Sequence, residues 1–299
     1  MTRKRLLDLF ENLYVWKRRG IRAPHKPLLL LLALGRVLDG RERLVPYTQI
    51  ENSLKELLRR FGPPRKAFHP EFPFNRLRND KLWEVPGSEI LSRTASRDFL
   101  VGELREHGIK GGFPEWAYEL LRNDSEIARE AAQGLLDAHF PESLHDQIRV
   151  ATGIPYPWKV RETPARRRDP AFRREVLREY EYRCAVCNFD VRLGDDLIGL
   201  EAAHIMWVAA GGPDKVANGL ALCGLHHKAL DRGAFGLEAI GANYRVLISS
   251  EVHGQSDPIR WFLDYHDKPL RPPRNRRLDP DPEYVNWHRR EVFRPPPLG

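Results

Sequence analysis

Three cysteines and one histidine constrain this 299-residue chain more than any other feature of its sequence. Two residues separate Cys184 from Cys187, and the same spacing separates Cys223 from His226 further along the chain. Such a spacing lets a tight turn direct both ligands at one ion, and two turns complete a tetrahedron of three sulfurs and one nitrogen. Since these are all the cysteines in the chain, a disulfide framework is not favoured. The pattern predicts a structural zinc site.

A second set of polar residues is interleaved with the zinc ligands. His204 follows the apolar run 197–200, which places it near the end of a β-strand, and Asn218 precedes the helix expected to carry His227. His227 and Asp231 are four residues apart, so they lie on one face of that helix and can bind one divalent cation together. We therefore predict a strand, a loop and a helix arranged around an ion.

The segment from Tyr182 to Leu237 resembles the HNH endonucleases, whose short ββα-metal fold is often pinned by a zinc ion with this cysteine arrangement. The resemblance implies that His204 is the general base that removes a proton from the attacking water. It implies that Asn218 orients either that base or the scissile phosphate. It also implies that His227 binds the catalytic metal, Mg²⁺ or Mn²⁺, which stabilises the transition state and the leaving 3′ oxygen.

The sequence departs from the commonest HNH pattern at one metal-binding position. Ala203 stands where many members of the family have an aspartate or a second histidine that binds the metal. The ligand contributed by the first strand is therefore undetermined. Asp231 is expected to complete the site, and Glu201 is the second candidate.

Length and proline content indicate two domains. The chain is about twice the usual length of a single domain. Four prolines and the run Arg166–Arg168 lie between Gly153 and Pro170, which is typical of a basic linker. We expect a modified-DNA recognition domain at residues 1–153, a linker at 154–169 and an HNH domain at 170–299. The predicted fold class is α+β, with a mainly helical first domain containing short strands and a ββα-metal second domain with structural zinc.

Apolar periodicity predicts most of the helices and leaves some segments irregular. Helices are expected at residues 5–18, from His25 onward, and at 47–61, 96–106, 114–122, 124–140 and 170–182. Short β-like runs are expected within 69–87. The Arg- and Pro-rich segment 268–299 has two interpretations: either it is a flexible tail, or it follows a DNA backbone through Arg271, Arg274, Arg276 and Arg277.

Charge and hydropathy limit the partners and the location of the protein. The formal net charge of +8 and the sequence pI of about 9.5 favour a polyanionic partner. The first ten residues place charges within the apolar pattern, which argues against a signal peptide. The longest apolar run, Leu28–Leu34, is too short to cross a bilayer. We expect a cytoplasmic protein without a membrane partner.

The N-terminal half carries a second resemblance. The segments RAPHKPLLLLLALG, HPEFPFNRLRNDKLWEV and GGFPEWAYELL are similar to the sulfur-binding domain of McrA-like restriction endonucleases, which act on phosphorothioate-modified DNA. In that family a sulfur-binding domain precedes an HNH domain, so the resemblance covers nearly the whole chain. It implies a restriction enzyme whose partner is double-stranded DNA that carries a phosphorothioate.

The resemblance implies a small apolar pocket for the sulfur atom. An aromatic ring, a proline ring and an alanine methyl form that pocket, and Phe113, Pro114 and Ala117 match them, with phenylalanine where tyrosine is usual. Sulfur is larger and less strongly hydrated than oxygen, so an apolar surface favours it. Contacts with phosphates and bases are expected from nearby basic or polar residues, namely Arg22, His25, Lys26, His69 and Arg76.

Three other functions stay open at this point. One alternative is the same nuclease with a domain that recognises a methylated or otherwise altered base, which would require an aromatic cage or a flipped-base pocket. A homing or repair nuclease would share the chemistry. From a different class, a zinc-stabilised DNA-binding protein would have no cutting activity. A nuclease with one HNH site per chain is expected to act as a homodimer when it cuts both strands.

Overall fold

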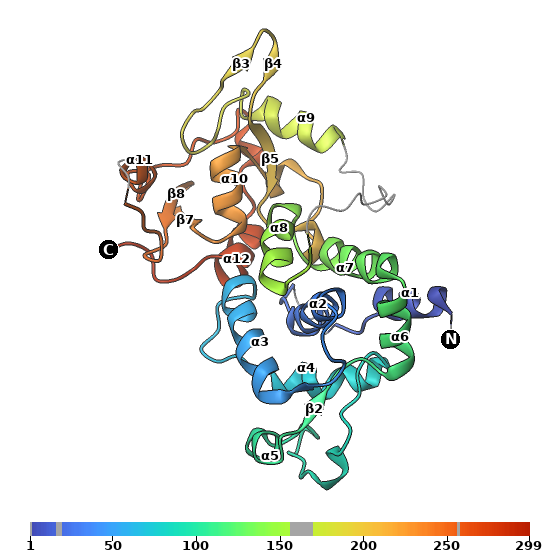
Figure 1. The fold of residues 1–299 in the computed structure, drawn as a ribbon. Coiled ribbons are helices and arrows are strands. Elements are labelled where there is room, and N and C mark those ends of the chain that lie inside the picture. The colour runs from blue at the N-terminus through green and yellow to red at the C-terminus, as the bar shows by residue number, and fades with distance from the viewer. Residues whose placement is uncertain (1, 16–19, 156–169, 256–257) are drawn as a thin grey trace. The chain divides into compact units, whose positions relative to one another are not determined.

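The computed structural model describes residues 2–15, 20–155, 170–255 and 258–299 (Figure 1). The chain divides into an N-terminal unit, residues 1–163, and a C-terminal unit, residues 164–299. Most of the linker expected at 154–169, including its arginine run, lies outside the described residues. Helices dominate the first unit and small antiparallel sheets are concentrated in the second, so the predicted α+β class is confirmed.

The N-terminal unit is built around one buried helix, α2 (His25–Leu38). Leucines on nearly all sides of this helix are buried, as expected for a helix that is apolar all round. The helices around it are α1 (Arg3–Glu11), α3 (Tyr47–Phe61), α4 (Glu71–Arg76), α6 (Glu115–Asn123), α7 (Ser125–His139) and α8 (Glu142–Thr152), and α5 (Val101–Glu106) packs on α3. The predicted buried helix is confirmed.

A two-residue antiparallel ladder joins β1 (Val45–Pro46) to β2 (Lys110–Gly111) in the N-terminal unit. Gly111 and Gly112 allow the chains to approach closely at this point. A Cβ on Gly112 would lie 2.0 Å from the Arg43 carbonyl oxygen, and one on Gly111 would lie 2.7 Å from the Trp83 ring. The two glycines therefore fix the path of the chain that enters α6.

The prediction of short β-like runs at 69–87 was wrong. This segment forms α4 followed by a 3₁₀ helix, Leu77–Asp80, with a single bridge from Glu84 to Gly112. Phe74 and Leu77, three residues apart, are both fully buried, and this helical spacing governs the segment in spite of its prolines. The helix expected at 96–106 is confined to α5.

Two other helices differ from expectation. The first helix, expected to reach residue 18, ends at Glu11, where the Asn12 backbone N–H caps it, and residues 16–19 lie outside the described residues. Helix α8 was not predicted. It buries Leu144 and Ile148 on the face that packs against α2 and α7, and Gly153 ends it with φ +72°.

The C-terminal unit contains the expected strand, strand and helix in succession. Strands β5 (Leu200–His204) and β6 (Gly219–Cys223) are antiparallel, with Leu200 opposite Cys223 and His204 opposite Gly219. Helix α10 (Gly224–Asp231) follows β6 directly. The other elements are α9 (Pro170–Glu179), the hairpins β3 (Arg192–Leu193) with β4 (Asp196–Leu197) and β7 (Phe235–Ile240) with β8 (Asn243–Ile248), α11 (Pro258–Leu263) and α12 (Pro282–Glu291).

The flexible-tail interpretation of 268–299 was wrong. Helix α12 starts with Asp281 as its N-cap and buries Val285 and Trp287. Beyond it, the Arg294 N–H donates to the carbonyl of Gly233 at 3.0 Å, which returns the chain to the centre of the unit. The apolar residues interspersed among the arginines and prolines supply this buried surface, so the segment belongs to the folded core.

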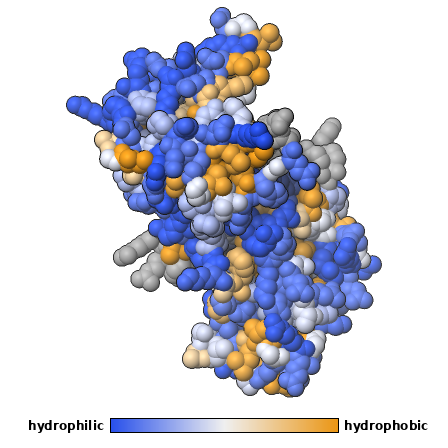
Figure 2. All heavy atoms as spheres, turned by 90° about the vertical axis from the view of Figure 1, so that its left-hand side faces the viewer, coloured by the Kyte–Doolittle hydropathy of each residue, from blue (hydrophilic) through white to orange (hydrophobic). Residues whose placement is uncertain are grey.

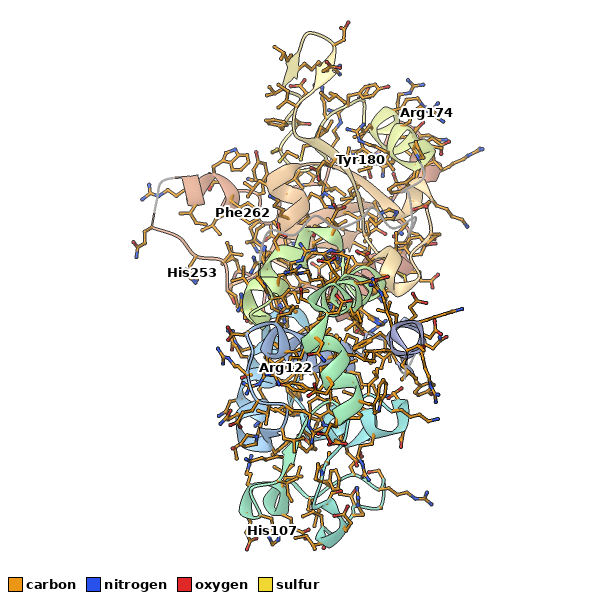
Figure 3. The ribbon with its side chains drawn as sticks, turned by 45° about the vertical axis from the view of Figure 1, so that its right-hand side comes forward. His107, Arg122, Arg174, Tyr180, His253 and Phe262 are labelled. Carbon is orange, nitrogen blue, oxygen red and sulfur yellow. The ribbon has the colours of Figure 1, made fainter. Side chains whose placement is uncertain are left out.

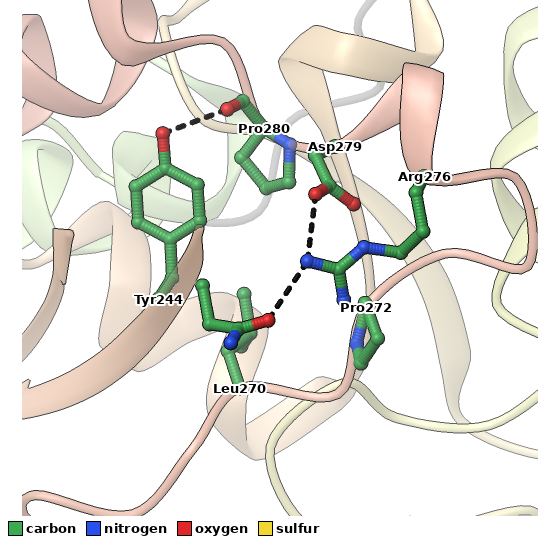
Figure 4. Close-up of a pocket in the computed structure, with 7 residues that line it drawn as sticks. Tyr244, Leu270, Pro272, Arg276, Asp279 and Pro280 are labelled. Carbon is green, nitrogen blue, oxygen red and sulfur yellow. Dashed lines mark hydrogen bonds and ion pairs between the residues drawn. The ribbon is translucent and has the colours of Figure 1, made fainter. Parts of the chain in front are cut away.

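The same segment packs against β8 around a small hollow (Figure 4). At its edge the Tyr244 hydroxyl donates to the Pro280 carbonyl at 2.8 Å, and Arg276 pairs with Asp279 at 3.0 Å. Arg271 pairs with Glu181. Arg271 and Arg276 therefore have structural contacts. A path of the DNA backbone along the four arginines stays a prediction.

The surface in Figure 2 is mostly polar, with separate apolar areas between the charged side chains. Among the described residues, no helix combines the length and the apolar character that a membrane span requires.

Candidate active site

The three cysteines and His226 form a cluster whose ligand atoms all lie within 4.8 Å of one another. The Nδ1 atom of His226 lies 3.2 Å from the Cys223 sulfur and 3.7 Å from the Cys184 sulfur. The sulfurs of Cys187 and Cys223 are 3.9 Å apart, well beyond a disulfide bond. Three sulfurs and one nitrogen that converge in this way fit a zinc ion, as the spacing predicted.

Two short segments present these ligands. In the first, the Asn188 N–H donates to the Cys184 carbonyl at 2.9 Å, with Asn188 at φ +59°, which turns the chain between the two cysteines. In the second, Cys223 ends β6 and serves as the N-cap residue of α10. Hydrogen bonds from the Cys184 and Cys187 thiols lower the pKa of Cys223, which favours a thiolate at that position.

Aromatic rings enclose the histidine of the cluster. The Phe262 ring, on α11, stacks on the His226 ring with 5.5 Å between centroids, and Phe262 is labelled in Figure 3. Trp261, Tyr265 and Phe235 contact the same imidazole. An apolar surround of this kind limits the access of water to metal ligands, which suits a closed structural site.

His204 stands at the end of β5, as predicted, and two neighbours define its orientation. Its ring lies flat on Phe172 of α9, with 4.0 Å between centroids and 13° between planes. Its Nε2 atom lies 2.7 Å from a carboxylate oxygen of Asp214, in the loop between β5 and β6. Sequence reasoning missed both neighbours, because neither lies at a regular spacing from His204.

Asn218 is fully buried at the start of β6 and holds that loop together. Its side-chain oxygen accepts from the Met206 N–H at 2.8 Å. Its amide nitrogen donates to the carbonyls of Met206 and Pro213, both at 3.0 Å. Strand β6 lies between Asn218 and α10; it is the second strand of the ββα order, to which the sequence analysis assigned no residues. This burial favours the first of the two roles considered for Asn218, orientation of the base.

His227 lies between two carboxylates. Its Nδ1 atom is 2.5 Å from an oxygen of Glu201, on β5, and its Nε2 atom is 3.4 Å from an oxygen of Asp231, one turn further along α10. The Glu201 side chain is 49% exposed and that of Asp231 is 3% exposed. Because side chains alternate along a strand, Glu201 projects from the same face of β5 as Ala203. Glu201 therefore places a carboxylate on the face of β5 where Ala203 replaces the usual metal ligand.

The three residues predicted to form the sulfur pocket adjoin one another at the start of α6. Pro114 is the N-cap residue of the helix and is partly buried. Phe113 and Ala117 are 2% and 0% exposed, and the Phe113 ring packs edge-on against Phe10 and Trp83. Phe113 thus belongs to the core of the N-terminal unit, and the pocket stays a prediction.

Two of the predicted DNA-binding residues have structural contacts. The Lys26 ammonium pairs with Asp80 at 2.6 Å, with side chains only 14% and 7% exposed. An Arg22 guanidinium N–H donates to the Phe61 carbonyl at 2.7 Å. Lys26 therefore ties α2 to the 3₁₀ helix, and its loss would leave a buried carboxylate unpaired.

His69 and Arg76 both contact the ring of Phe72. The His69 ring stacks on Phe72 with 4.8 Å between centroids, and the Arg76 guanidinium lies 4.2 Å from the same ring. Arg76 also binds Asp98 through two hydrogen bonds of 2.9 and 2.6 Å. The Asp98 carboxylate fixes the Arg76 side chain and offsets part of its charge.

His25, the fifth predicted residue, begins α2 beside this group. Burial, together with the smaller effects of the charges of His69, Arg65 and Arg76, lowers the pKa of His25 to about 4. The imidazole is therefore neutral at pH 7 in the free protein. The same neighbours that disfavour a proton on His25 would favour a phosphate anion beside it.

The fold and the site together define a ββα-metal unit, with a cluster of three cysteines and one histidine that fits zinc, in the same chain as a helical domain, and family models match both parts. Residues 184–238 match the HNH endonuclease model. Residues 3–155, more than half of the chain, match the model described as ScoMcrA-like, DNA sulfur-binding domain. The chain belongs to this ScoMcrA-like family. Both predicted resemblances are confirmed.

Solved structures similar to this chain align with about half of it. The sulfur-binding domain of ScoMcrA complexed with phosphorothioated DNA is 26% identical, over 50% of this chain and 94% of that chain, with a TM-score of 0.44. The sulfur-binding domain of SprMcrA complexed with phosphorothioated DNA is 22% identical, over 52% and 95%, with a TM-score of 0.44. The type IV phosphorothioation-dependent restriction endonuclease ScoMcrA is 24% identical, over 48% of this chain and 28% of that chain, with a TM-score of 0.42. No curated protein sequence matches the chain.

Removal of the zinc site should unfold the C-terminal unit. We expect Cys184→Ser to abolish stoichiometric zinc binding and to remove the thermal transition of this unit, because zinc ligation supplies folding free energy. Metal analysis and calorimetry of the full chain measure both effects. Asp195→Ala, at an exposed position of the β3–β4 hairpin, is the control. A Cys184→Ser protein that keeps both its zinc and its transition would contradict a zinc site at this cluster.

The burial of His25 should make the stability of the N-terminal unit depend on pH. Above about pH 6.5 His25 is neutral in both the folded and the unfolded states, so its protonation does not reduce the free energy of unfolding. Toward pH 4 the unfolded chain takes up a proton that the folded chain does not, and stability is lost. Between pH 7 and pH 5 the wild type should lose up to about 2 kcal/mol more than His25→Asn in denaturant titrations. His107→Asn, at an exposed histidine labelled in Figure 3, should behave as the wild type; equal losses in all three proteins would refute the prediction.

Proposed function

We propose that this protein is a restriction endonuclease that recognises phosphorothioate DNA with its N-terminal unit and hydrolyses phosphodiester bonds with its C-terminal unit. One observation carries the proposal: a ScoMcrA-like sulfur-binding domain and an HNH endonuclease unit occur in the same chain. We keep residues 1–153 and 170–299 as the limits of the two domains. The reduced cysteines of the zinc cluster suit a cytoplasmic enzyme.

In this proposal His204 is the general base. Its position at the end of β5 and its fixed ring orientation allow it to take a proton from a water molecule that attacks phosphorus. Asn218 acts indirectly, because it is buried and holds the loop that continues from His204. Its role is to position the base, and it does not contact the phosphate.

Residues of β5 and α10 would hold the catalytic divalent metal. His227 and Glu201 approach each other at Nδ1, and an imidazole with a carboxylate is a donor set that suits Mn²⁺ or Mg²⁺. Such an ion supplies positive charge to the transition state and to the leaving oxygen. Asp231, which the sequence analysis favoured as a ligand, is better placed to accept from Nε2 of His227 and fix the orientation of the ring.

Recognition of the modification is assigned to the start of α6 and the basic residues near His25. Phe113, Pro114 and Ala117 would supply an apolar surface for sulfur, with Pro114 as its most accessible member. His69 and Arg76 would contact neighbouring phosphates. Each chain has one HNH centre, so we propose that two chains act together to cut both strands.

Digestion of matched DNA duplexes tests the proposal. We expect cleavage of a duplex that contains a single phosphorothioate in the presence of Mn²⁺ or Mg²⁺. The same duplex with ordinary phosphates should be cut at least about tenfold more slowly, because its oxygen loses hydration in an apolar pocket. The rates are measured at one fixed salt concentration, since phosphate contacts make binding depend strongly on salt.

Two further arms separate the remaining interpretations. The His204→Ala variant should bind the modified duplex and leave it uncut. Equal cleavage of both duplexes would overturn sulfur recognition and leave the nuclease, whereas selective cleavage of a methylated duplex would support the altered-base alternative. A wild-type protein that binds DNA and leaves every duplex intact would identify a zinc-stabilised DNA-binding protein without activity.

A further inference from the structure

We infer that Asp214 positions the His204 ring directly for proton transfer, on the loop that Asn218 holds, an inference that rests on the proposed nuclease function. The carboxylate of Asp214 lies 2.7 Å from Nε2 of His204, and no sequence pattern connects the two residues. The His204 side chain is 11% exposed and that of Asp214 is 39% exposed. The pair therefore lies at the surface of the C-terminal unit, where a DNA backbone can reach it.

The contact assigns the two ring nitrogens of His204. An ionised carboxylate only accepts hydrogen bonds, so the proton of the neutral imidazole is on Nε2 and the lone pair is on Nδ1. Stacking on Phe172 fixes the plane of the His204 ring but still allows the ring to turn within that plane. The contact with Asp214 restricts this turning. Together the two contacts hold Nδ1 in one direction.

This assignment gives a balanced proton transfer. Nδ1 takes a proton from the attacking water, and the water oxygen forms the new bond to phosphorus. The bond from phosphorus to the 3′ oxygen breaks, and that oxygen takes a proton from solvent. His204 is then an imidazolium whose positive charge faces the Asp214 carboxylate, so Asp214 favours the charged form of the base as well as its orientation.

The loop that carries Asp214 is fixed on both sides of the pair. Asn218 binds the backbone of Met206, two residues after His204, and the carbonyl of Pro213, directly before Asp214. Gly212, within the same loop, approaches the Met206 backbone so closely that an added Cβ would be 1.9 Å from the Met206 carbonyl oxygen. The carboxylate is thus presented by a rigid loop, which is what a positioning residue requires.

Kinetics of Asp214 variants on phosphorothioate DNA test the inference. We expect Asp214→Ala to lower kcat about 10- to 100-fold with little change in KM, because binding contacts stay in place while the base loses its orientation. Asp214→Glu should recover part of kcat. Asp195→Ala, an exposed aspartate on the β3–β4 hairpin, should match the wild type. Unchanged zinc content and thermal transitions confirm that the variants are folded.

Nitrogen-15 spectra of the histidine side chains give a readout that is independent of turnover. His204 should carry its proton on Nε2 in the wild type and should become a mixture of tautomers in Asp214→Ala. An Asp214→Ala protein with wild-type kcat, or with a change in KM alone, would overturn the inference. If the wild-type protein leaves every duplex uncut, the proposed function itself fails, and if His204→Ala cuts normally, the assignment of His204 as the base fails. Both outcomes are distinguishable from a failure of the Asp214 inference alone.

Discussion

The cluster of three cysteines and one histidine, whose donor set fits zinc, lies where the elements of the C-terminal unit meet. Cys223 ends β6 and His226 lies in the first turn of α10, so an ion bound to both fixes the helix at the end of the strand. Cys184 and Cys187 add the turn that follows α9, and the Ala185 N–H donates to the Ala221 carbonyl of β6 at 2.8 Å. A short hairpin and a helix of eight residues bury little apolar surface, so ligation of an ion by these four residues would contribute a large share of their stability.

This arrangement places the two candidate catalytic histidines on separate elements with separate supports. His204 ends β5 and is oriented by Phe172 and Asp214, while His227 lies in α10 between Glu201 and Asp231. For His204 a carboxylate faces one ring nitrogen, whereas for His227 a carboxylate faces each of the two. Hydrogen bonds of this kind hold an imidazole well only when the partner is fixed, and the Asn218 side chain fixes the loop between β5 and β6.

The parts of the site that the sequence predicted are those governed by local spacing. Two-residue gaps identified the zinc ligands, and the spacing of four residues identified the approach of His227 to Asp231. Glu201 and Asp214 reach their histidines through strand pairing and a loop, and no short-range pattern reports such contacts. Glu201 ranked below Asp231 as a candidate metal ligand in the sequence analysis. The approach of Glu201 to His227 depends on the packing of α10 on β5, which no local spacing shows.

The fold shows the same division between local and tertiary effects. Helices with regular apolar spacing, such as α3, were predicted to the residue, whereas α4 and the segment around α12 were obscured by prolines and arginines. Their buried residues, Phe74 and Trp287 among them, pack against distant parts of the chain, and that packing outweighs local preference.

Anomalous diffraction from Mn²⁺ tests the central claim most directly, in crystals of the His204→Ala variant bound to an uncut phosphorothioate duplex. The account predicts one Mn²⁺ about 2 Å from Nδ1 of His227 and from a carboxylate oxygen of Glu201, in contact with a phosphate of the DNA. Mn²⁺ bound elsewhere, with the Glu201 carboxylate turned away from His227, would contradict it.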